Sequence, residues 1–233
     1  MDGADPGSEP VTNNPLVTFF DSHTSGRGIW KWRHYFEIYH RHFSRFVGRD
    51  VHVLEIGVYS GGSLEMWKYY FGPQARLYGV DIEPGCKAYE DETVKIFIGD
   101  QADAEFWQAF KREVPLLDIV IDDGGHEAHQ QITTLEEVFP HLRPGGVYLC
   151  EDVSGRGNAF AAYIAQLSDH LNTYDWRADY EDNERRLIVN PTSFQCTVNS
   201  IHLYPFVAVL ERTHNKTDFV APKHGTQWQP FLT

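Results

Sequence analysis

Apolar and polar positions alternate along the chain in a way that predicts strands and helices in turn. Short runs of Val, Ile and Leu bounded by turn residues are typical of strands buried on both faces. Such runs occupy residues 51–56, 76–80 and 94–98, and two more end in the acidic pairs Asp122-Asp123 and Glu151-Asp152. The segments between them have apolar residues three or four positions apart, which predicts helices. This alternation predicts an α/β domain with a mostly parallel sheet and helices on both of its faces.

Turn and cap residues refine the expected boundaries of these elements. Asp103 is expected to cap the helix after the third strand, and Arg143–Gly146 is expected to form a turn into the fifth strand. Residues 200–204 and 207–210 predict a tight antiparallel hairpin, because only two residues separate them.

The ends of the chain follow weaker patterns than the middle. Residues 29–46 carry aromatic side chains at spacings of three and four, which predict an amphipathic helix. Its aromatic face could pack on the main domain, or form a lid over a pocket with His34 or Tyr35 reaching in, or do both. Residues 172–199 lack clear periodicity and predict a long functional loop or an insertion. We expect four parts: a disordered N-terminus at 1–15, a helical lid at 16–48, the main domain at 49–211 and a C-terminal tail at 212–233.

Composition narrows the possible classes of protein. The chain has 233 residues and a formal charge of -13, from 20 basic and 33 acidic residues. This length suits one domain with appendages, and the acidic balance disfavours nucleic acids and anionic membranes as partners. Three scattered cysteines without a CxxC motif form no disulfide framework. Since we find neither a signal peptide nor an apolar run of membrane-spanning length, we expect a cytoplasmic protein.

Acidic residues end the fourth and fifth predicted strands. Asp122 and Asp123 follow one apolar run, and Glu151 and Asp152 follow the other. Because the carboxyl ends of parallel strands meet at one edge of the sheet, these four side chains should lie close together. A divalent cation would offset their repulsion and suits oxygen ligands, and His126 is near enough in sequence to serve the same site. The alternative is that the acids cap helices and end strands, and that the histidine merely begins a helix.

A glycine-containing loop follows the first predicted strand. Gly57 and Gly61 let the backbone turn tightly, and the next helix would point its free N–H groups at this loop. The loop is not a GxGxxG motif, because Tyr59 stands where a second close glycine would be. Asp81 ends the second strand and could bind a ribose diol, which both NAD and adenosyl cofactors contain.

Taken together in this order, these segments resemble a known family. The sequence is similar to class I S-adenosylmethionine-dependent methyltransferases, and within them to the metal-dependent macrolide-sugar O-methyltransferases of the mycinamicin and macrocin type and the related proteins called cephalosporin hydroxylases. The segments that carry the resemblance are His34–Tyr39, Val53–Gly57, Gly61–Trp67, Tyr78–Asp81, Gly99–Gln101, Ile121–His126, Arg143–Gly146, Glu151-Asp152 and Ser200–Tyr204.

The resemblance implies a Rossmann-like methyltransferase sheet and roles for particular residues. It implies that His126 is the catalytic base, and that Mg²⁺ or another divalent cation is held by Asp123, Glu151 and Asp152. It also implies that S-adenosylmethionine is bound by Glu55, Gly57, Ser60, Gly61, Ser63, Asp81, Asp100, Gln101 and Asp122.

The expected activity is methylation of a hydroxyl on a small molecule, a sugar or natural-product diol, by a homo-oligomer. A vicinal diol could bind the metal through both oxygens. The sequence departs from the family pattern at Phe36, where a small polar residue is expected, and at Gly125, where serine is expected. The alternatives are an NAD-linked oxidoreductase, which the missing GxGxxG motif disfavours, and a non-catalytic binding protein, which the retained acids and histidine disfavour. A hydroxylase is disfavoured because no 2-His-1-carboxylate iron motif is evident.

Overall fold

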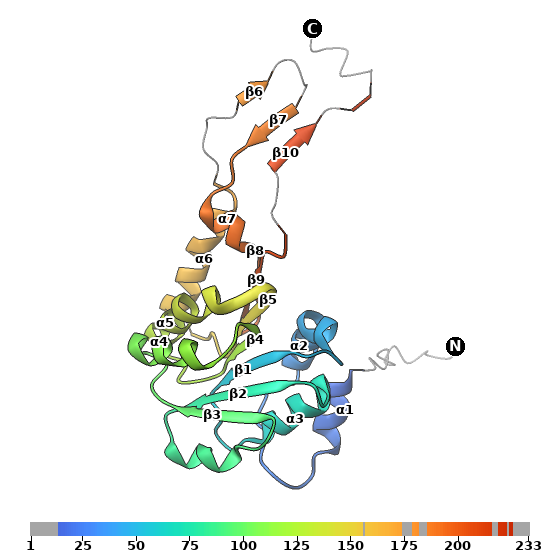
Figure 1. The fold of residues 1–233 in the computed structure, drawn as a ribbon, viewed down its shortest axis with the longest axis vertical. Helices are drawn as coiled ribbons and strands as arrows, with labels where there is room; N and C mark the ends of the chain where they lie inside the picture. The colour runs from blue at the N-terminus through green and yellow to red at the C-terminus, as the bar shows by residue number, and fades with distance from the viewer. Residues whose placement is uncertain are drawn as a thin grey trace, which may run out of the picture.

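The computed structural model describes residues 14–155, 157–173, 179–181, 186–215, 219–222 and 224–225. Its centre is a seven-stranded sheet with the strand order β3-β2-β1-β4-β5-β9-β8 (Figure 1). The strands are β1 (His52–Ile56), β2 (Arg76–Asp81), β3 (Val94–Ile98), β4 (Leu117–Asp122), β5 (Leu142–Cys150), β8 (Val198–Tyr204) and β9 (Val207–Arg212). The first five are parallel, whereas β9 runs antiparallel to both β5 and β8. The predicted α/β sheet with a C-terminal antiparallel hairpin is therefore confirmed.

Two hydrophobic layers cover the sheet, one on each face. Because successive strand residues point to opposite faces, Ile119 and Ile121 of β4 join one core cluster and Val120 joins the other. The first cluster contains residues of α1 (Pro15–Ser22), α2 (Tyr35–Phe43) and α3 (Gly62–Phe71). The second contains residues of α4 (Ala104–Glu113), α5 (Ala128–Val138) and α6 (Ala159–Leu171). Three short 3₁₀ helices, η1 (Ser44–Phe46), η2 (Pro84–Tyr89) and η3 (Phe139–His141), complete this part of the fold.

Side-chain hydrogen bonds cap the first turns of two helices, and the cap at Asp103 was expected. The Asp103 side chain caps α4 by accepting a hydrogen bond from the backbone N–H of Glu105. Glu127 and Gln130 form a reciprocal capping box at the start of α5. The expected turn at Arg143–Gly146 is wrong, because these residues lie inside β5, where the pairing with β4 shifts register between Leu117 and Ile119.

The helix expected over 29–46 is also shorter than predicted. It begins only at Tyr35, and the preceding residues 29–32 form no regular element. The reason is tertiary: the neighbouring side chains Lys31 and Trp32 both bind acidic residues at the edge of the sheet, and these contacts override helical periodicity. The aromatic face itself is buried, with Tyr39 and Phe43 fully enclosed.

Residues 172–199 are more structured than the expected loop. They contain β6 (Asp179–Glu181), β7 (Arg186–Val189) and α7 (Ser193–Thr197). A strand from the C-terminal tail, β10 (Phe219–Pro222), pairs with β7 to complete a second, three-stranded sheet that stands apart from the main sheet (Figure 1).

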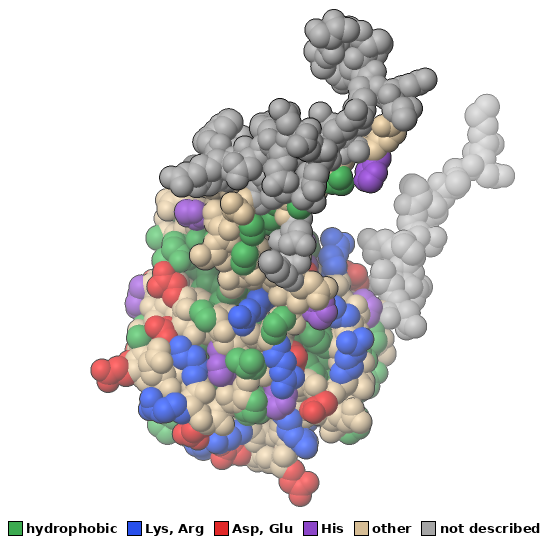
Figure 2. Space-filling view, turned by 45° about the horizontal axis from the view of Figure 1, so that its top comes forward, with side chains coloured by type: hydrophobic (Ala, Val, Ile, Leu, Met, Phe, Trp, Pro, Cys, Tyr) green, Lys and Arg blue, Asp and Glu red, His purple; other side chains and the backbone are tan. Residues whose placement is uncertain are grey.

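The N-terminal prediction of disorder falls mostly on residues 1–13, which lie outside the described part of the chain. Asn14 is buried and caps α1. Figure 2 shows acidic and basic side chains interspersed over one face of the molecule. Among the described helices, none has both the length and the apolar character needed to cross a membrane.

Candidate active site

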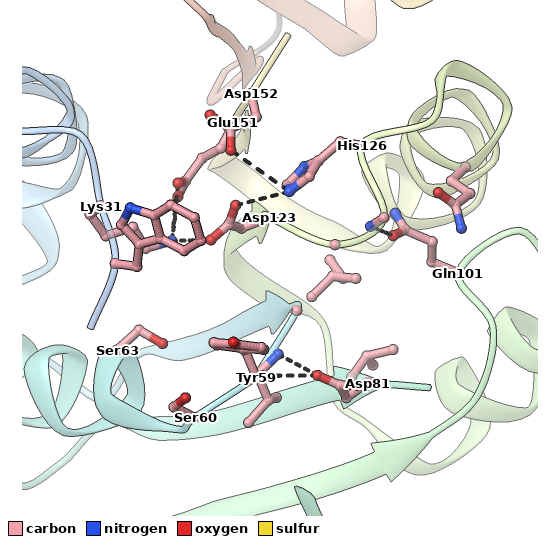
Figure 3. A pocket seen from close by; sticks show the side chains of 18 of the residues that line it. Lys31, Tyr59, Ser60, Ser63, Asp81, Gln101, Asp123, His126, Glu151 and Asp152 are labelled. Carbon is pink, nitrogen blue, oxygen red and sulfur yellow. Dashed lines mark hydrogen bonds and ion pairs between the residues drawn. The ribbon is translucent and has the colours of Figure 1, made fainter. Parts of the chain in front are cut away.

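A cavity of about 940 Å³ lies at the carboxyl ends of the parallel strands. One wall carries Ser60 from the loop after β1, Ser63 from the first turn of α3 and Asp81 from the end of β2 (Figure 3). The opposite wall carries the acids that follow β4 and β5, together with His126. The extended segment at residues 28–33 closes the cavity on a third side. The cavity therefore sits at the edge of the sheet that the acidic strand ends predict.

Most of the residues expected to bind a cofactor line this cavity, namely Gly57, Ser60, Ser63, Asp81, Asp100 and Gln101. Gly57 has a φ of +87°, and a Cβ at this position would overlap the backbone carbonyl of Asp123. Glycine is therefore required where the β1 loop passes close to the β4 loop.

Three of the expected cofactor residues do not line the cavity. Glu55 is buried beneath it and accepts hydrogen bonds from Ser63 Oγ (2.7 Å) and Trp67 Nε1 (3.0 Å). Gly61 is the left-handed N-cap residue of α3, with a φ of +73°. The strand pleat explains the position of Glu55, because its neighbours in β1 alternate between the two faces of the sheet. Both residues shape the cavity wall without forming its surface.

Asp122 is the third such residue. It is buried and accepts hydrogen bonds from Gln101 Nε2 (2.9 Å) and Tyr148 Oη (2.7 Å). Burial raises the pKa of Asp122 to about 6, although both hydrogen bonds act in the opposite direction. Asp122 thus supports Gln101, which does line the cavity and whose Oε1 accepts from the backbone N–H of Gly125 (2.7 Å).

Asp81 is held by the backbone of the β1 loop. Its Oδ2 accepts from the N–H groups of Val58 and Tyr59, both at 2.9 Å, and its Oδ1 accepts from the N–H of Glu83 at 2.9 Å. A carboxylate offers about four acceptor positions. Three bonds fix the carboxylate in place and leave capacity for a hydroxyl donor in the cavity.

Asp123, His126 and Asp152 converge on the opposite wall. His126 Nε2 lies 3.9 Å from Asp123 Oδ1 and 3.7 Å from Asp152 Oδ2. One ligand atom from each of the three lies within 4.8 Å of the others, which is close enough for a shared cation. His126 and Asp152 both have positive φ values, 58° and 53°, in a region that side-chain-bearing residues rarely adopt. Such conformations cluster at functional sites.

Asp152 is bound by two side chains from the N-terminal part of the chain. Tyr35 Oη donates to Asp152 Oδ1 at 2.6 Å, and Trp32 Nε1 donates to the same oxygen at 3.1 Å. Burial and the hydrogen bond to Asp152 raise the pKa of Tyr35 well above its ordinary value, so its hydroxyl remains a donor. Of the two residues expected to reach the pocket, Tyr35 does so, whereas His34 is exposed and contacts the Pro205 carbonyl (3.0 Å).

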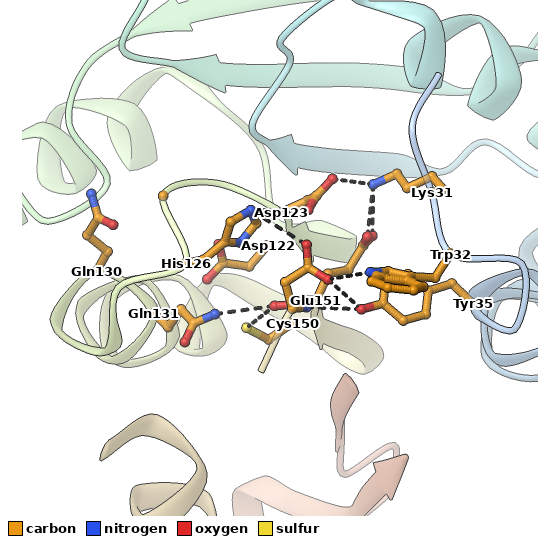
Figure 4. Close-up of polar contacts among 12 residues, drawn as sticks. Lys31, Trp32, Tyr35, Asp122, Asp123, His126, Gln130, Gln131, Cys150 and Glu151 are labelled. Carbon is orange, nitrogen blue, oxygen red and sulfur yellow. Dashed lines mark hydrogen bonds and ion pairs between the residues drawn. The ribbon is translucent and has the colours of Figure 1, made fainter. Parts of the chain in front are cut away.

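Glu151 faces a lysine that the sequence analysis did not consider. Lys31 Nζ lies 3.0 Å from both carboxylate oxygens of Glu151 and 2.5 Å from Asp123 Oδ2 (Figure 4). Tyr39 Oη donates to Glu151 Oε1 at 2.6 Å. Burial raises the pKa of Glu151, and the negative charge of Asp123 adds to the rise, while Lys31 opposes it. The sequence did hold an indication of this contact. The predicted cluster of acids requires a nearby positive charge, and a lysine of the same chain can supply it.

Comparisons with known proteins find similarity to methyltransferases. A family model described as a methyltransferase domain matches residues 54–153. An 8-demethyl-8-(2-methoxy-alpha-L-rhamnosyl)-tetracenomycin-C 3'-O-methyltransferase from Streptomyces olivaceus is 34% identical over 220 residues, which cover 84% of this chain and 54% of that protein. Residues 54–153 of this chain therefore form a methyltransferase domain. The resemblance to macrolide-sugar O-methyltransferases is thereby confirmed.

Two further similar proteins are named for mycinamicin or its biosynthetic pathway. The mycinamicin VI 2''-O-methyltransferase of Micromonospora griseorubida is 44% identical over 123 residues, covering 49% of this chain and 30% of that protein. The solved structure of the MycE methyltransferase from the mycinamycin biosynthetic pathway, in complex with Mg, SAH and mycinamycin VI, aligns with a TM-score of 0.67 and 28% identity. That alignment covers 87% of this chain and 54% of the MycE chain. This chain therefore spans about half the length of the first relatives that it matches, or less.

Proposed function

We propose that this methyltransferase transfers the methyl group of S-adenosylmethionine to a hydroxyl of a sugar or natural-product diol, with the assistance of a divalent cation. The observation that carries the proposal is the position of His126 Nε2, which faces Asp123 and Asp152 across the cavity from Asp81. A candidate base, a set of oxygen ligands and a candidate ribose-binding acid thus line one cavity. Two relatives whose names specify O-methyl transfer support this reaction.

The wall formed by the β1 and β2 loops is the proposed cofactor side. Asp81 would accept hydrogen bonds from the ribose hydroxyls, for which it retains acceptor capacity. Asp100 and Gln101 line the next part of the cavity, where the adenine would lie. Ser63 would contact the methionine part, because Glu55 fixes its hydroxyl from below.

Asp123 and Asp152, with Glu151 behind them, are the proposed metal ligands. Hard divalent cations such as Mg²⁺ prefer carboxylate oxygens, and this donor set fits that preference. When bound, the cation would supply Lewis-acid stabilisation of negative charge on the acceptor oxygen. Tyr35 and Trp32 would orient Asp152 through the hydrogen bonds they donate to it.

His126 is the proposed general base. Its Nε2 faces the cavity and would take the proton of the acceptor hydroxyl as the oxygen attacks the sulfonium methyl group. The carboxylates of Asp123 and Asp152, 3.9 and 3.7 Å away, would then stabilise the imidazolium that forms. The histidine is partly exposed, which lets it pass the proton on to solvent.

The acceptor would lie beside the exposed aromatic rings at the mouth of the cavity. Trp32 and Phe206 both line it, with their ring centroids 5.8 Å apart. Aromatic faces of this kind suit the apolar face of a sugar ring, while two neighbouring hydroxyls could approach Asp152. The names of the relatives, which specify rhamnosyl and macrolide acceptors, support a glycosylated small molecule.

The proposal is tested by methyl transfer from isotope-labelled S-adenosylmethionine to a panel of rhamnosylated and macrolide acceptors. We expect transfer with Mg²⁺, loss of transfer with EDTA, and recovery when Mg²⁺ is restored. His126→Gln should reduce the rate about 10²- to 10⁴-fold without weakening cofactor binding, whereas His129→Gln on the surface should not. Full transfer in EDTA, or by the His126→Gln variant, would refute the proposed roles.

A further inference from the structure

Lys31 occupies an unusual position for a lysine. Its side chain is only 3% exposed, and its ammonium lies between the carboxylates of Asp123 and Glu151. Lysine is seldom so deeply buried unless its charge is paired. Here the charge is paired with two carboxylates, because Nζ lies 2.5 Å from Asp123 Oδ2 and 3.0 Å from Glu151 Oε1.

The contacts of Lys31 use the oxygens that a metal ion would need. Its Nζ is within 3.0 Å of both oxygens of Glu151, and it binds Oδ2 of Asp123. Glu151 Oε1 receives a further bond from Tyr39, so both oxygens of Glu151 already have partners. The ligand atoms that remain free to converge come from Asp123, His126 and Asp152. A cation that used all three acids would compete directly with the lysine.

We propose that Lys31 is the resident counter-ion of the acidic cluster, and that a divalent cation displaces its ammonium when it binds Asp123 and Glu151. This inference rests on the proposed function, because it assumes that the cluster is the metal site. Lys31 stabilises Asp123 and Glu151 when the metal is absent, and it lowers the affinity of the cluster for the metal by competing for the oxygens of these two acids.

Displacement of Lys31 would also alter the cavity wall. The segment that carries it, residues 28–33, lines the cavity, and the neighbouring Trp32 binds Asp152. The backbone carbonyls of Arg27 and Gly28 pack so closely on Gly62 that a Cβ there would overlap them. The N-terminal end of the segment is therefore fixed. If Lys31 moves, the part of the segment that shifts would be the part near Trp32. Metal binding would thereby change the position of Trp32 in the cavity wall beside which the acceptor would lie.

The inference is tested by titrating Mn²⁺, followed by electron paramagnetic resonance of the free ion, into the wild-type protein and two variants. Lys31→Met should bind Mn²⁺ at least about tenfold more tightly, because a positive charge about 3 Å from the ligand oxygens is removed. Lys111→Met is the matched control, since it breaks a partly buried lysine–glutamate pair of 2.7 Å between α4 and α5. It should leave the affinity unchanged. Equal or weaker binding by a folded Lys31→Met variant would overturn the inference.

A second measurement on the wild-type protein covers the case in which Lys31→Met does not fold. Acetylation of lysines by an N-hydroxysuccinimide ester, followed by mass spectrometry, reports the accessibility of each ammonium. Lys31 should react slowly in metal-free protein and faster with saturating Mn²⁺. Continued protection of Lys31 in metal-saturated protein would refute displacement while leaving the proposed function intact. Failure of the wild-type protein and of Lys31→Met to bind Mn²⁺ would instead refute the metal site itself.

Discussion

Tyr35 donates a hydrogen bond of 2.6 Å to Asp152, although 117 positions separate the two residues in sequence. The bond joins the first turn of α2 to the loop after β5. Asp152 holds a positive φ of 53° there, a conformation that needs support from its surroundings. The N-terminal part of the chain thus helps to build the acidic wall of the cavity.

Replacing Tyr35 by Phe should therefore impair the site without unfolding the protein. Loss of one hydrogen bond to a ligand carboxylate typically costs about 10- to 100-fold in metal affinity or activity. We expect Tyr35→Phe to weaken Mn²⁺ binding within this range, measured by the same resonance titration. Tyr69→Phe, at an exposed position on α3, should behave as the wild type. Unchanged affinity in Tyr35→Phe would show that the bond does not position Asp152.

A glycine substitution tests the close approach of the β1 and β4 loops. Gly57 and Gly48 both have positive φ, +87° and +73°, but only at Gly57 would a Cβ overlap the backbone of another segment. Gly57→Ala should lower the free energy of unfolding by about 3 kcal/mol, and Gly48→Ala by about 1 kcal/mol, because only the former adds a clash to the backbone strain. Urea unfolding followed by circular dichroism measures both. Equal losses would mean that the loops can separate at no cost.

The lowered pKa of Glu211 should make the free energy of unfolding depend on pH. Its hydrogen bond with His42 (2.9 Å), aided by the charge of Arg45, lowers the pKa of Glu211 to about 2. A carboxyl with a depressed pKa in the folded state stabilises the protein above its unfolded pKa, and this contribution is lost as pH falls through the folded value. The carboxyl is partly exposed, so solvent screening limits the effect to about 1 kcal/mol.

Glu211→Gln should accordingly lower the free energy of unfolding by about 1 kcal/mol at pH 7. The difference from the wild type should shrink as pH falls from about 4.5 toward 2, where the native carboxyl also becomes protonated. Urea unfolding at a series of pH values measures it, with Glu92→Gln on the surface as the control. A difference that stays constant down to the lowest pH would rule out the ion pair as its source.

The parts of the site that follow from local sequence are the parts that could be predicted. Paired acids after apolar runs mark the ends of β4 and β5, and parallel strands bring those ends together. Asp103 before a helix caps it, because the cap hydrogen bond spans only two residues. Such features depend on contacts between near neighbours, or on the general geometry of a parallel sheet.

Contacts between distant segments could not be predicted in the same way. Lys31 binds Glu151 across 120 positions, and this contact removes residues 29–32 from the helix that their aromatic spacing indicates. Strand β7 pairs with β10, which lies in the C-terminal tail, as well as with β6. Glu55 and Asp122 stand next to cavity residues in sequence, yet both side chains are buried outside the cavity lining. Whether a given acid lines the cavity or is buried outside it depends on side-chain packing, which the pattern of apolar and polar residues does not specify.

We expect this cavity to bind the adenosyl cofactor, with Asp81 hydrogen-bonded to its ribose. Isothermal titration of S-adenosylhomocysteine into the wild-type protein and into Asp81→Asn tests this, with Glu92→Gln as a control of equal charge change. We predict saturable binding of one equivalent by the wild type and by Glu92→Gln. Asp81→Asn should bind at least about tenfold more weakly, because it loses a charged hydrogen bond to the ribose. Absence of binding by the wild type, or equal affinity in Asp81→Asn, would contradict the claim.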